Sequence, residues 1–445
     1  MWSLGKLQAH TLLELHALNA ERYPVLLESS AASLDGNNHD ILMAFPGELL
    51  SLNADGALSA PTGLTATSFL GALDQWWQLE RLPEQPHSLP FHGGWFVYLS
   101  YELAREIEPS LHLPGRGLIA RAVRVPAAIV RNCTTGEAWF VAEPGDEDYR
   151  SVLQRDLVSA QQATVSSRLA SLQVSEEAPQ QFIDAVHAAL DHIAAGDIYQ
   201  ANLSRGWRTQ LPPETTPQLL YLALRRANPA PFAGLAMLHD AHAIISSSPE
   251  RLIELRHGWA NTRPIAGTRP RHADPLADRR LLEELRAHPK ERAEHIMLLD
   301  LERNDLGRIC VGGSVEVNEY MTIESYAHVH HIVSNVRGRL RDDVTPAAAI
   351  AAVFPGGTIT GCPKVRCMEI IAELEHTARG AYTGSMGYLN RDGSMDLNIL
   401  IRTLELEGRT LTFRAGAGIV ADSIPERELE ETRAKALGLV RALQS

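Results

Sequence analysis

The segment 411–437, LTFRAGAGIVADSIPERELEETRAKAL, restricts the fold of this chain more than any other stretch. It predicts a short strand, a turn that carries Gly416 and Gly418, a second strand, and then a helix. Ser423 and Glu426 have the spacing of a capping box, which marks the start of that helix. Because a glycine turn leaves backbone N–H groups open, this segment could hold an anion beside the helix.

The predicted helix places charged side chains on one face. Glu428, Glu431 and Lys435 follow one another at intervals of three and four residues. Two carboxylates and an ammonium group next to a glycine turn would suit a small polycarboxylate held through a divalent metal ion. A solvent-exposed face with ion pairs of about 0.3–0.5 kcal/mol each explains the same spacing. The helix alone leaves both interpretations open.

A second pair of carboxylates stands near the start of another predicted helix, at residues 290–301. Glu291 and Glu294 lie one turn apart, ahead of an apolar stripe that contains Leu298 and Leu301. Like charges at this spacing repel each other. A metal ion, a cationic neighbour or open solvent would each relieve that repulsion.

The charge of the chain limits its partners. Its 445 residues carry a net charge of -13, which argues against a nucleic-acid partner or an anionic membrane surface. Positive charge for an anionic substrate must therefore come from local arginine or lysine residues or from a metal ion. The four cysteines form no CxxC pair, which indicates a reducing cytosol. Without a signal peptide or an apolar run of about 18 residues, a cytoplasmic protein with no membrane span is expected.

Three segments are predicted along the chain. Residues 1–165 form a mixed, strand-rich lobe, the polar residues 166–180 form a linker, and residues 181–445 form a second lobe. In the second lobe, residues 397–404 and 410–413 alternate like strands separated by a tight turn. Hairpins of this kind predict antiparallel pairing.

Nine ordered segments of the chain resemble the chorismate-utilising enzymes. They are GDIYQANLSR, SPERL, TRPIAGTRPR, EHIMLLDLERNDLGR, HHIVSNVRGRL, FPGGTITGCPKVRCMEIIAELE, YTGSMGYL, IRT and RAGAGIVADSIPERELEET. The resemblance is close over residues 180–440 and looser over residues 20–165. Within this family, the chain is most similar to component I of the aminodeoxychorismate synthases, which aminate chorismate at C4. The resemblance implies an α+β fold: a two-lobed sandwich of large antiparallel sheets flanked by helices, as in anthranilate synthase component I.

The resemblance also assigns a cofactor, Mg2+, to the two acidic helices. Glu294 and Glu431 would bind the ion, while Glu291 and Glu428 would act through water or stand just outside the ligands. The ion would hold the ring carboxylate of chorismate. Carboxylate and water oxygens are the ligands that this hard, strongly hydrated cation prefers.

Further contacts with chorismate follow from the same resemblance. Arg402 and Lys435, with the backbone N–H groups of Gly416 and Gly418, would hold the carboxylate of the enolpyruvyl arm. The residues expected to line the ring are Tyr382, Thr358, Thr268 and His331.

Two residues carry the chemistry that the resemblance implies. Glu250 would protonate the C4 hydroxyl as it leaves, which requires a raised pKa for its carboxyl group. Gln200 stands where family members that add water carry a lysine base, and its neutral amide suits ammonia as the nucleophile. Because no glutaminase is encoded here, a separate glutamine amidotransferase, component II, is the expected partner.

One departure from the family pattern leaves the product open. Enzymes of the aminodeoxychorismate type commonly read Pro-Ile-Lys-Gly-Thr, and this chain has Ala266 in place of the lysine. Anthranilate-type enzymes carry alanine there, but they usually read Pro-Ala-Gly-Thr-Leu-Ser-Gly-Ala-Pro where residues 355–363 read PGGTITGCP. The interpretation favoured here is therefore an aminodeoxychorismate synthase. An anthranilate synthase and a homologue that binds chorismate without turnover are the alternatives.

A second ligand is also considered for the first lobe. Residues 26–29, LLES, resemble the tryptophan-binding strand of anthranilate synthases. The resemblance implies a tryptophan pocket there, in a regulatory or a structural role.

Overall fold

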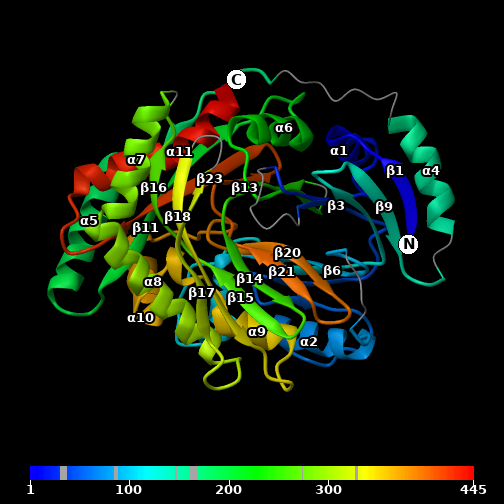
Figure 1. The fold of residues 1–445 in the computed structure, drawn as a ribbon, viewed down its shortest axis with the longest axis horizontal. Coiled ribbons are helices and arrows are strands. Elements are labelled where there is room, and N and C mark those ends of the chain that lie inside the picture. The colour runs from blue at the N-terminus through cyan, green and yellow to red at the C-terminus, as the bar shows by residue number, and fades with distance from the viewer. Residues whose placement is uncertain are drawn as a thin grey trace.

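The computed structural model describes residues 1–30, 38–84, 89–145, 148–160, 169–239, 241–272, 274–325 and 329–444. Over these residues the chain folds into two large antiparallel β-sheets with helices packed around them (Figure 1). The expected α+β sandwich is confirmed. None of the described helices is long and apolar enough to cross a membrane.

The first sheet runs through strands from both ends of the chain. In spatial order it contains β1 (Trp2–Lys6), β9 (Glu137–Ala142), β8 (Ala127–Asn132), β3 (His39–Ala44), β2 (Val25–Glu28), β12 (Phe232–His239), β13 (His242–Ser248), β22 (Thr403–Glu407), β23 (Thr410–Ile419), β11 (Gln200–Gln210) and β10 (Ser175–Glu176), with β19 (Gly361–Cys362) paired to β11.

The second sheet is built in the same mixed way. Its order is β16 (Ile265–Pro270), β18 (Val329–Arg339), β15 (Trp259–Arg263), β14 (Arg251–Arg256), β21 (Met395–Asn398), β20 (Ser385–Asn390), β6 (Gly94–Leu99), β7 (Leu118–Val125), β4 (Leu49–Asn53) and β5 (Leu58–Ser59), with β17 (Glu316–Ser325) paired to β18.

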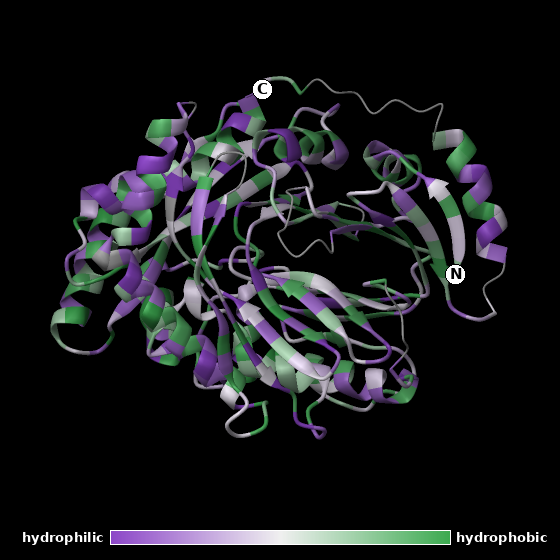
Figure 2. Cartoon of the chain, viewed as in Figure 1, coloured by the Kyte–Doolittle hydropathy of each residue, from purple (hydrophilic) through white to green (hydrophobic). Residues whose placement is uncertain are grey.

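Helices cover the outer faces of both sheets and one end of the sandwich (Figure 1). They are α1 (Ala9–Leu18), α2 (Phe69–Glu80), α3 (Ala104–Ile107), α4 (Asp148–Ala160), α5 (Pro179–Ala194), α6 (Pro217–Ala227), α7 (Pro275–Ala287), α8 (Pro289–Gly307), α9 (Pro346–Val353), α10 (Lys364–Glu375) and α11 (Pro425–Gln444). Hydrophilic and hydrophobic residues alternate along the outer helices, as expected for helices with one face on a sheet (Figure 2).

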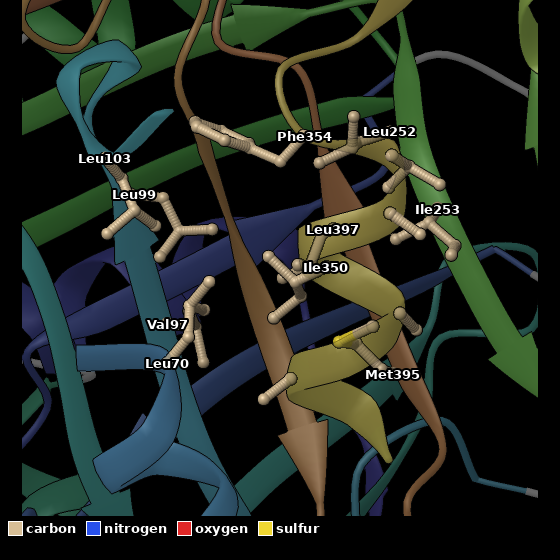
Figure 3. Packing of buried hydrophobic residues seen from close by; sticks show 14 of the residues in the cluster. Leu70, Val97, Leu99, Leu103, Leu252, Ile253, Ile350, Phe354, Met395 and Leu397 are labelled. Atoms are coloured by element: carbon tan, nitrogen blue, oxygen red, sulfur yellow. The ribbon is translucent and has the colours of Figure 1, made fainter. Parts of the chain in front are cut away.

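Alternating side chains divide the core into layers. Along β6, Val97 and Leu99 point to the outer face, where they pack with Ile350 of α9 in one cluster (Figure 3). Phe96 and Tyr98 of the same strand belong to the cluster between the two sheets. This period of two is the expected consequence of the strand pleat.

Both sheets join strands from the two predicted lobes. The antiparallel pairs β2–β12 and β6–β20 connect residues below 165 with residues above 181. The division into an N-terminal lobe, a linker and a catalytic lobe therefore stays a prediction about the chain, while the sheets themselves are continuous. Within the predicted linker, residues 166–168 lie outside the described residues, residues 175–176 form β10, and α5 begins at Pro179.

Three local predictions need correction. The predicted turn at Gly416 and Gly418 is wrong, because both glycines lie inside the continuous strand β23, which pairs with β11 along its length. The single strand predicted at 397–404 is broken between β21 and β22, where Arg402 adopts a left-handed φ of 51°. Ser423 accepts a hydrogen bond from the N–H of Val420 (3.1 Å), before the helix starts, so it is no capping-box residue.

A buried ion pair fixes α10 against the first sheet. Arg379 and Glu375 lie 2.6 Å apart with side chains 1% and 2% exposed. Glu375 also pairs with Arg414 of β23 at 3.2 Å and accepts a hydrogen bond from the N–H of Ser204 of β11 at 2.8 Å. Arg379 donates in turn to the carbonyl of Asn202 at 2.6 Å. These charges hold together the strands that carry the candidate site.

Replacing Arg379 by methionine is expected to lower the free energy of unfolding by about 3–5 kcal/mol, because Glu375 would lose one of its two arginine partners in a buried position. The matched change at Arg303, whose side chain is 53% exposed beside Asp300, should alter that free energy by less than about 0.5 kcal/mol. Urea unfolding of the three proteins measures both effects. Equal losses in the two variants would contradict the role given to the buried pair.

Candidate active site

The predicted site residues converge where β11, β23, α8 and α11 meet. Gln200 begins β11, and the antiparallel register sets Gly418 opposite Asn202 and Gly416 opposite Ser204. Helix α11 follows β23 directly and packs against it, while α8 packs against β16 and β18 of the other sheet. Segments more than 200 residues apart in sequence are thus neighbours in the fold.

The two glycines of β23 allow polar side chains to close over the strand. A β-carbon at Gly418 would lie 2.5 Å from Nε2 of Gln200 and 3.6 Å from Oε1 of Glu294. At Gly416 it would lie 2.5 Å from Oδ1 of Asn202 and 2.7 Å from the hydroxyl of Tyr382. Glycine is needed here for close approach rather than for a turn.

Three of the four predicted metal ligands lie near enough to affect one another electrostatically. Burial raises the pKa of Glu294, and the carboxylates of Glu291 and Glu431 raise it further, against the opposing effects of Lys435 and Gln200. The Nε2 group of Gln200 donates to Glu294 at 3.4 Å. A cation between these carboxylates would relieve their repulsion, and carboxylate oxygens suit a hard divalent ion. The donor chemistry therefore fits Mg2+, whose assignment to Glu294 and Glu431 stays a prediction.

These carboxylates also have neighbours within the chain. Glu431 pairs with Lys435 at 2.8 Å, and Glu291 pairs with Arg269 of β16 at 3.0 Å. The fourth carboxylate, Glu428, is buried. The spacing of Glu431 and Lys435 thus produces the ion pair expected of an i,i+4 pair, in a position that also faces the other residues of the site.

Lys435 and Tyr382 both approach the strand at Gly416. The ammonium group of Lys435 donates to the carbonyl of Gly416 at 3.0 Å. Although desolvation opposes it, the Glu431 carboxylate raises the pKa of Lys435, and that of Tyr382 is raised by burial. A cation and a phenol therefore both lie beside Gly416.

Glu250 is a buried carboxylic acid just after β13. Its residue is 4% exposed, and burial raises its pKa to about 7, against smaller effects of Thr358, the backbone at Ile265, Arg402 and Lys435. Its Oε1 atom has no hydrogen-bond partner of ordinary geometry. A substantial fraction of this side chain thus carries a proton at neutral pH.

Arg402 lies near this acid, and His331 lies near Arg402. The two side chains differ in charge. Burial lowers the pKa of Arg402, and the nearby Glu250 carboxylate opposes that effect. His331 is 1% exposed, and burial together with the charge of Arg402 lowers its pKa to about 3. His331 is therefore a neutral imidazole, and Arg402 supplies the positive charge here.

Several buried oxygen atoms of the site lack a hydrogen-bond partner. They belong to Gln200, Asn202, Glu250 and Thr358. Buried polar atoms are rarely left unsatisfied, so a polar ligand between these residues would complete their hydrogen bonding. One predicted residue cannot be placed fully: the backbone of Thr268 pairs with His331, and its side chain lies outside the described residues.

Sequence reasoning missed a group of acids behind Glu250. Glu302 of α8 is buried, and burial with the neighbouring Asp305 raises its pKa to about 8. Asp305 pairs with Lys364 at 2.5 Å. Asn202, beside Gly416, was missed as well. All four residues lie within family-like segments, but only three-dimensional packing shows that they adjoin the site.

Comparison with known proteins agrees with this geometry. The family of chorismate binding enzymes matches residues 37–441. An anthranilate synthase component I-like protein of Synechocystis is 42% identical over 81% of this chain and 74% of its own length. Anthranilate synthase component 1 of Thermus thermophilus is 42% identical over 82% of this chain and 80% of its own. Aminodeoxychorismate synthase component 1 of Bacillus subtilis is 48% identical over 59% of this chain and 55% of its own.

Solved structures give the same result for the fold. Anthranilate synthase component I from Streptococcus pneumoniae superposes with a TM-score of 0.79 at 30% identity, over 90% of this chain and 92% of that one. The resemblance expected from the nine sequence segments is confirmed by these matches. The chain is thus a member of the chorismate binding enzyme family, of the anthranilate and aminodeoxychorismate synthase type.

Proposed function

We propose that this chain is component I of an aminodeoxychorismate synthase, which converts chorismate and ammonia into 4-amino-4-deoxychorismate and water. The buried acid Glu250 supports an amination in which the C4 hydroxyl is the leaving group. Its carboxyl proton passes to that hydroxyl, which departs as water, and ammonia supplies the new bond to the ring. The proton that ammonia then loses can restore the acid.

Binding and orientation fall to the other residues. Arg402 and Lys435 would supply positive charge for the enolpyruvyl carboxylate, which would lie near Gly416 and Gly418 beside the polar side chains that pack over these glycines. Mg2+ bound by Glu294 and Glu431 would hold the ring carboxylate and withdraw electron density from the ring. The neutral amide of Gln200 lies beside Glu294. Because an amide is not acidic, it would not protonate ammonia.

The observation that carries the choice of product is the packing around Gly356. A β-carbon at this position, where the anthranilate pattern has alanine, would lie 2.7 Å from Cδ1 of Ile399, the flexible end of that side chain. Thr360 donates its hydroxyl hydrogen to the carbonyl of Gly356 at 2.9 Å. This loop carries Thr358, which stands beside Glu250. The glycine at position 356 supports the proposed 4-amino product, because the loop that carries it also carries Thr358.

A second candidate, anthranilate synthase component I, is favoured by one residue. Ala266 is 6% exposed in β16 and offers only a methyl group where a lysine nucleophile is common in aminodeoxychorismate synthases. The Thermus thermophilus relative, 42% identical over 82% of this chain, is named an anthranilate synthase. A homologue that binds chorismate without turnover would have no need of the buried acid at Glu250.

The proposal includes a partner and a location. Component I of these synthases needs ammonia, so a glutamine amidotransferase, component II, is the proposed partner of a cytoplasmic enzyme.

Tryptophan binding in the N-terminal lobe stays a prediction. In that lobe Glu28 is buried and accepts hydrogen bonds from Tyr221 at 2.5 Å and Arg225 at 2.9 Å, so a tryptophan ammonium group would have to join an existing ion pair.

Incubating the purified protein with chorismate, Mg2+ and excess ammonium should yield 4-amino-4-deoxychorismate. Mass spectrometry identifies it, and 4-aminobenzoate should appear only after the corresponding lyase is added. Anthranilate as the main product would overturn the proposal in favour of the second candidate. Chorismate binding with no product at high ammonium would favour the non-catalytic homologue.

Replacing Glu250 by glutamine should lower kcat at least about a hundredfold, the usual scale for the loss of a general acid, while chorismate binding persists. Because the protonated form is the active one, wild-type kcat/KM should fall as the pH rises above about 7. Glu316→Gln, a change at a half-exposed glutamate on β17, is the matched control and should keep full activity. Full activity in the Glu250 variant would remove that residue from its role.

The same raised pKa should appear in protein stability without any substrate. Between the ordinary value of 4.5 and about 7, the folded state keeps the Glu250 proton and the unfolded state does not, so the free energy of unfolding falls as pH rises. From pH 5 to pH 8 the wild type should lose about 3 kcal/mol more than Glu250→Gln. Urea unfolding at the two pH values measures the difference, and an identical loss in both proteins would show that Glu250 is not a buried acid.

A further inference from the structure

A compact group of potential metal ligands lies away from the predicted Mg2+ residues. In the described part of the chain, the nitrogen or oxygen atoms of His242, Glu405 and Glu407 all lie within 4.8 Å of one another. The four carboxylates assigned to Mg2+ do not include any of these residues. This group is therefore a separate site in the fold.

Strand pairing accounts for the convergence. The antiparallel register of β13 and β22 sets His242 directly opposite Glu407, and Glu405 follows two residues earlier on the same face. Their neighbours Ala243 and Leu406 point the other way, into the outer core of the first sheet. The three polar side chains thus face the space between the two sheets.

Two of the three groups are withdrawn from solvent and already positioned. His242 is 2% and Glu405 is 9% exposed, and Nε2 of His242 lies 3.0 Å from Oε1 of Glu405. The other carboxylate oxygen of Glu405 accepts a hydrogen bond from the N–H of Ala381 at 3.3 Å. A pair so fixed loses little conformational freedom when it binds an ion.

An independent observation comes from the opposite sheet. The hydroxyl of Tyr98 on β6 is fully buried and has no hydrogen-bond partner, and its ring packs edge-on against the ring of His242, with 6.4 Å between centroids. Burial raises the pKa of Tyr98 well above its usual value, with Glu405 and Glu407 among the further causes. Tyr98 is thus a phenol donor near the carboxylates with no acceptor.

One cation of the chain shares these carboxylates. The guanidinium of Arg116 lies 3.2 Å from Glu407 and 4.0 Å from Glu405, and its side chain is 53% exposed. Arg116 is therefore a half-exposed counter-ion that can turn toward solvent. A metal ion in the site would compete with it.

We propose that His242, Glu405 and Glu407 bind a Zn2+-class divalent ion, with the Tyr98 hydroxyl donating to a water molecule on that ion. One imidazole and two carboxylates form a donor set that suits zinc better than magnesium, which prefers oxygen alone. The ion would tie β13 to β22, the strand that follows Arg402, and to the Ala381–Tyr382 backbone through Glu405. The ion would thereby restrict the movement of Arg402 and Tyr382, two residues of the candidate active site.

Titration of the chelator-treated full chain with Zn2+, followed by calorimetry, tests the proposal. One equivalent should bind, and Co2+ should give the visible absorption of a four- or five-coordinate site. Arg116→Ala should bind Zn2+ at least about threefold more tightly, because the competing cation is gone. His242→Ala and Glu405→Gln should each lose this equivalent, whereas Glu431→Gln, at the predicted Mg2+ site, should keep it.

Glu407→Gln is a variant that should still fold, because Glu407 is partly exposed. Zn2+ should raise the melting temperature of the wild type but not that of this variant, with unchanged circular dichroism in both. If neither the wild type nor Arg116→Ala binds Zn2+ or Co2+ at millimolar concentration, the site is an ion-pair network and the proposal fails. It fails equally if the equivalent survives in the His242 and Glu405 variants. Neither result depends on which amination product the enzyme makes.

Discussion

The pairing of β11 with β23 is the interaction on which the candidate site depends. It runs without a break from Ala201 opposite Ile419 to Gln210 opposite Thr410. This ladder fixes Gln200 beside the glycines of β23, and it directs α11 back across the strand with Glu431 and Lys435 toward the site. A slip of β11 by one residue would turn Gln200 to the other face of the sheet.

Buried ion pairs inside the sandwich stabilise the pairing of β11 with β23. Burial favours the neutral form of Glu375, yet Arg379 and Arg414 hold its pKa below the usual range. The triad links α10, the turn before β20, and β23, so three separate segments share one electrostatic centre.

Sequence reasoning succeeded where local signals and tertiary structure agree. Helical periodicity and proline predicted the starts of α8 and α11 to within about two residues, although α8 continues to Gly307, well beyond its predicted end at residue 301. The ordered motifs named the family. It failed at Gly416 and Gly418, because glycine favours turns unless a long ladder holds it extended. It also failed at Glu302 and at His242, whose neighbours are set by strand pairing and packing that no local pattern encodes.

The contrast between Glu250 and Glu294 explains how one site can hold two kinds of carboxyl group. Glu250 is enclosed, and burial is the main cause of its raised pKa, so the proton is stable on it without any ligand. For Glu294, neighbouring carboxylates add to burial, and a cation would reverse their effect. Enclosure thus favours the protonated acid at Glu250, and the added crowding at Glu294 favours the cation proposed there. Because both depend on the same packed strands, the separation of roles follows from the fold rather than from residue type.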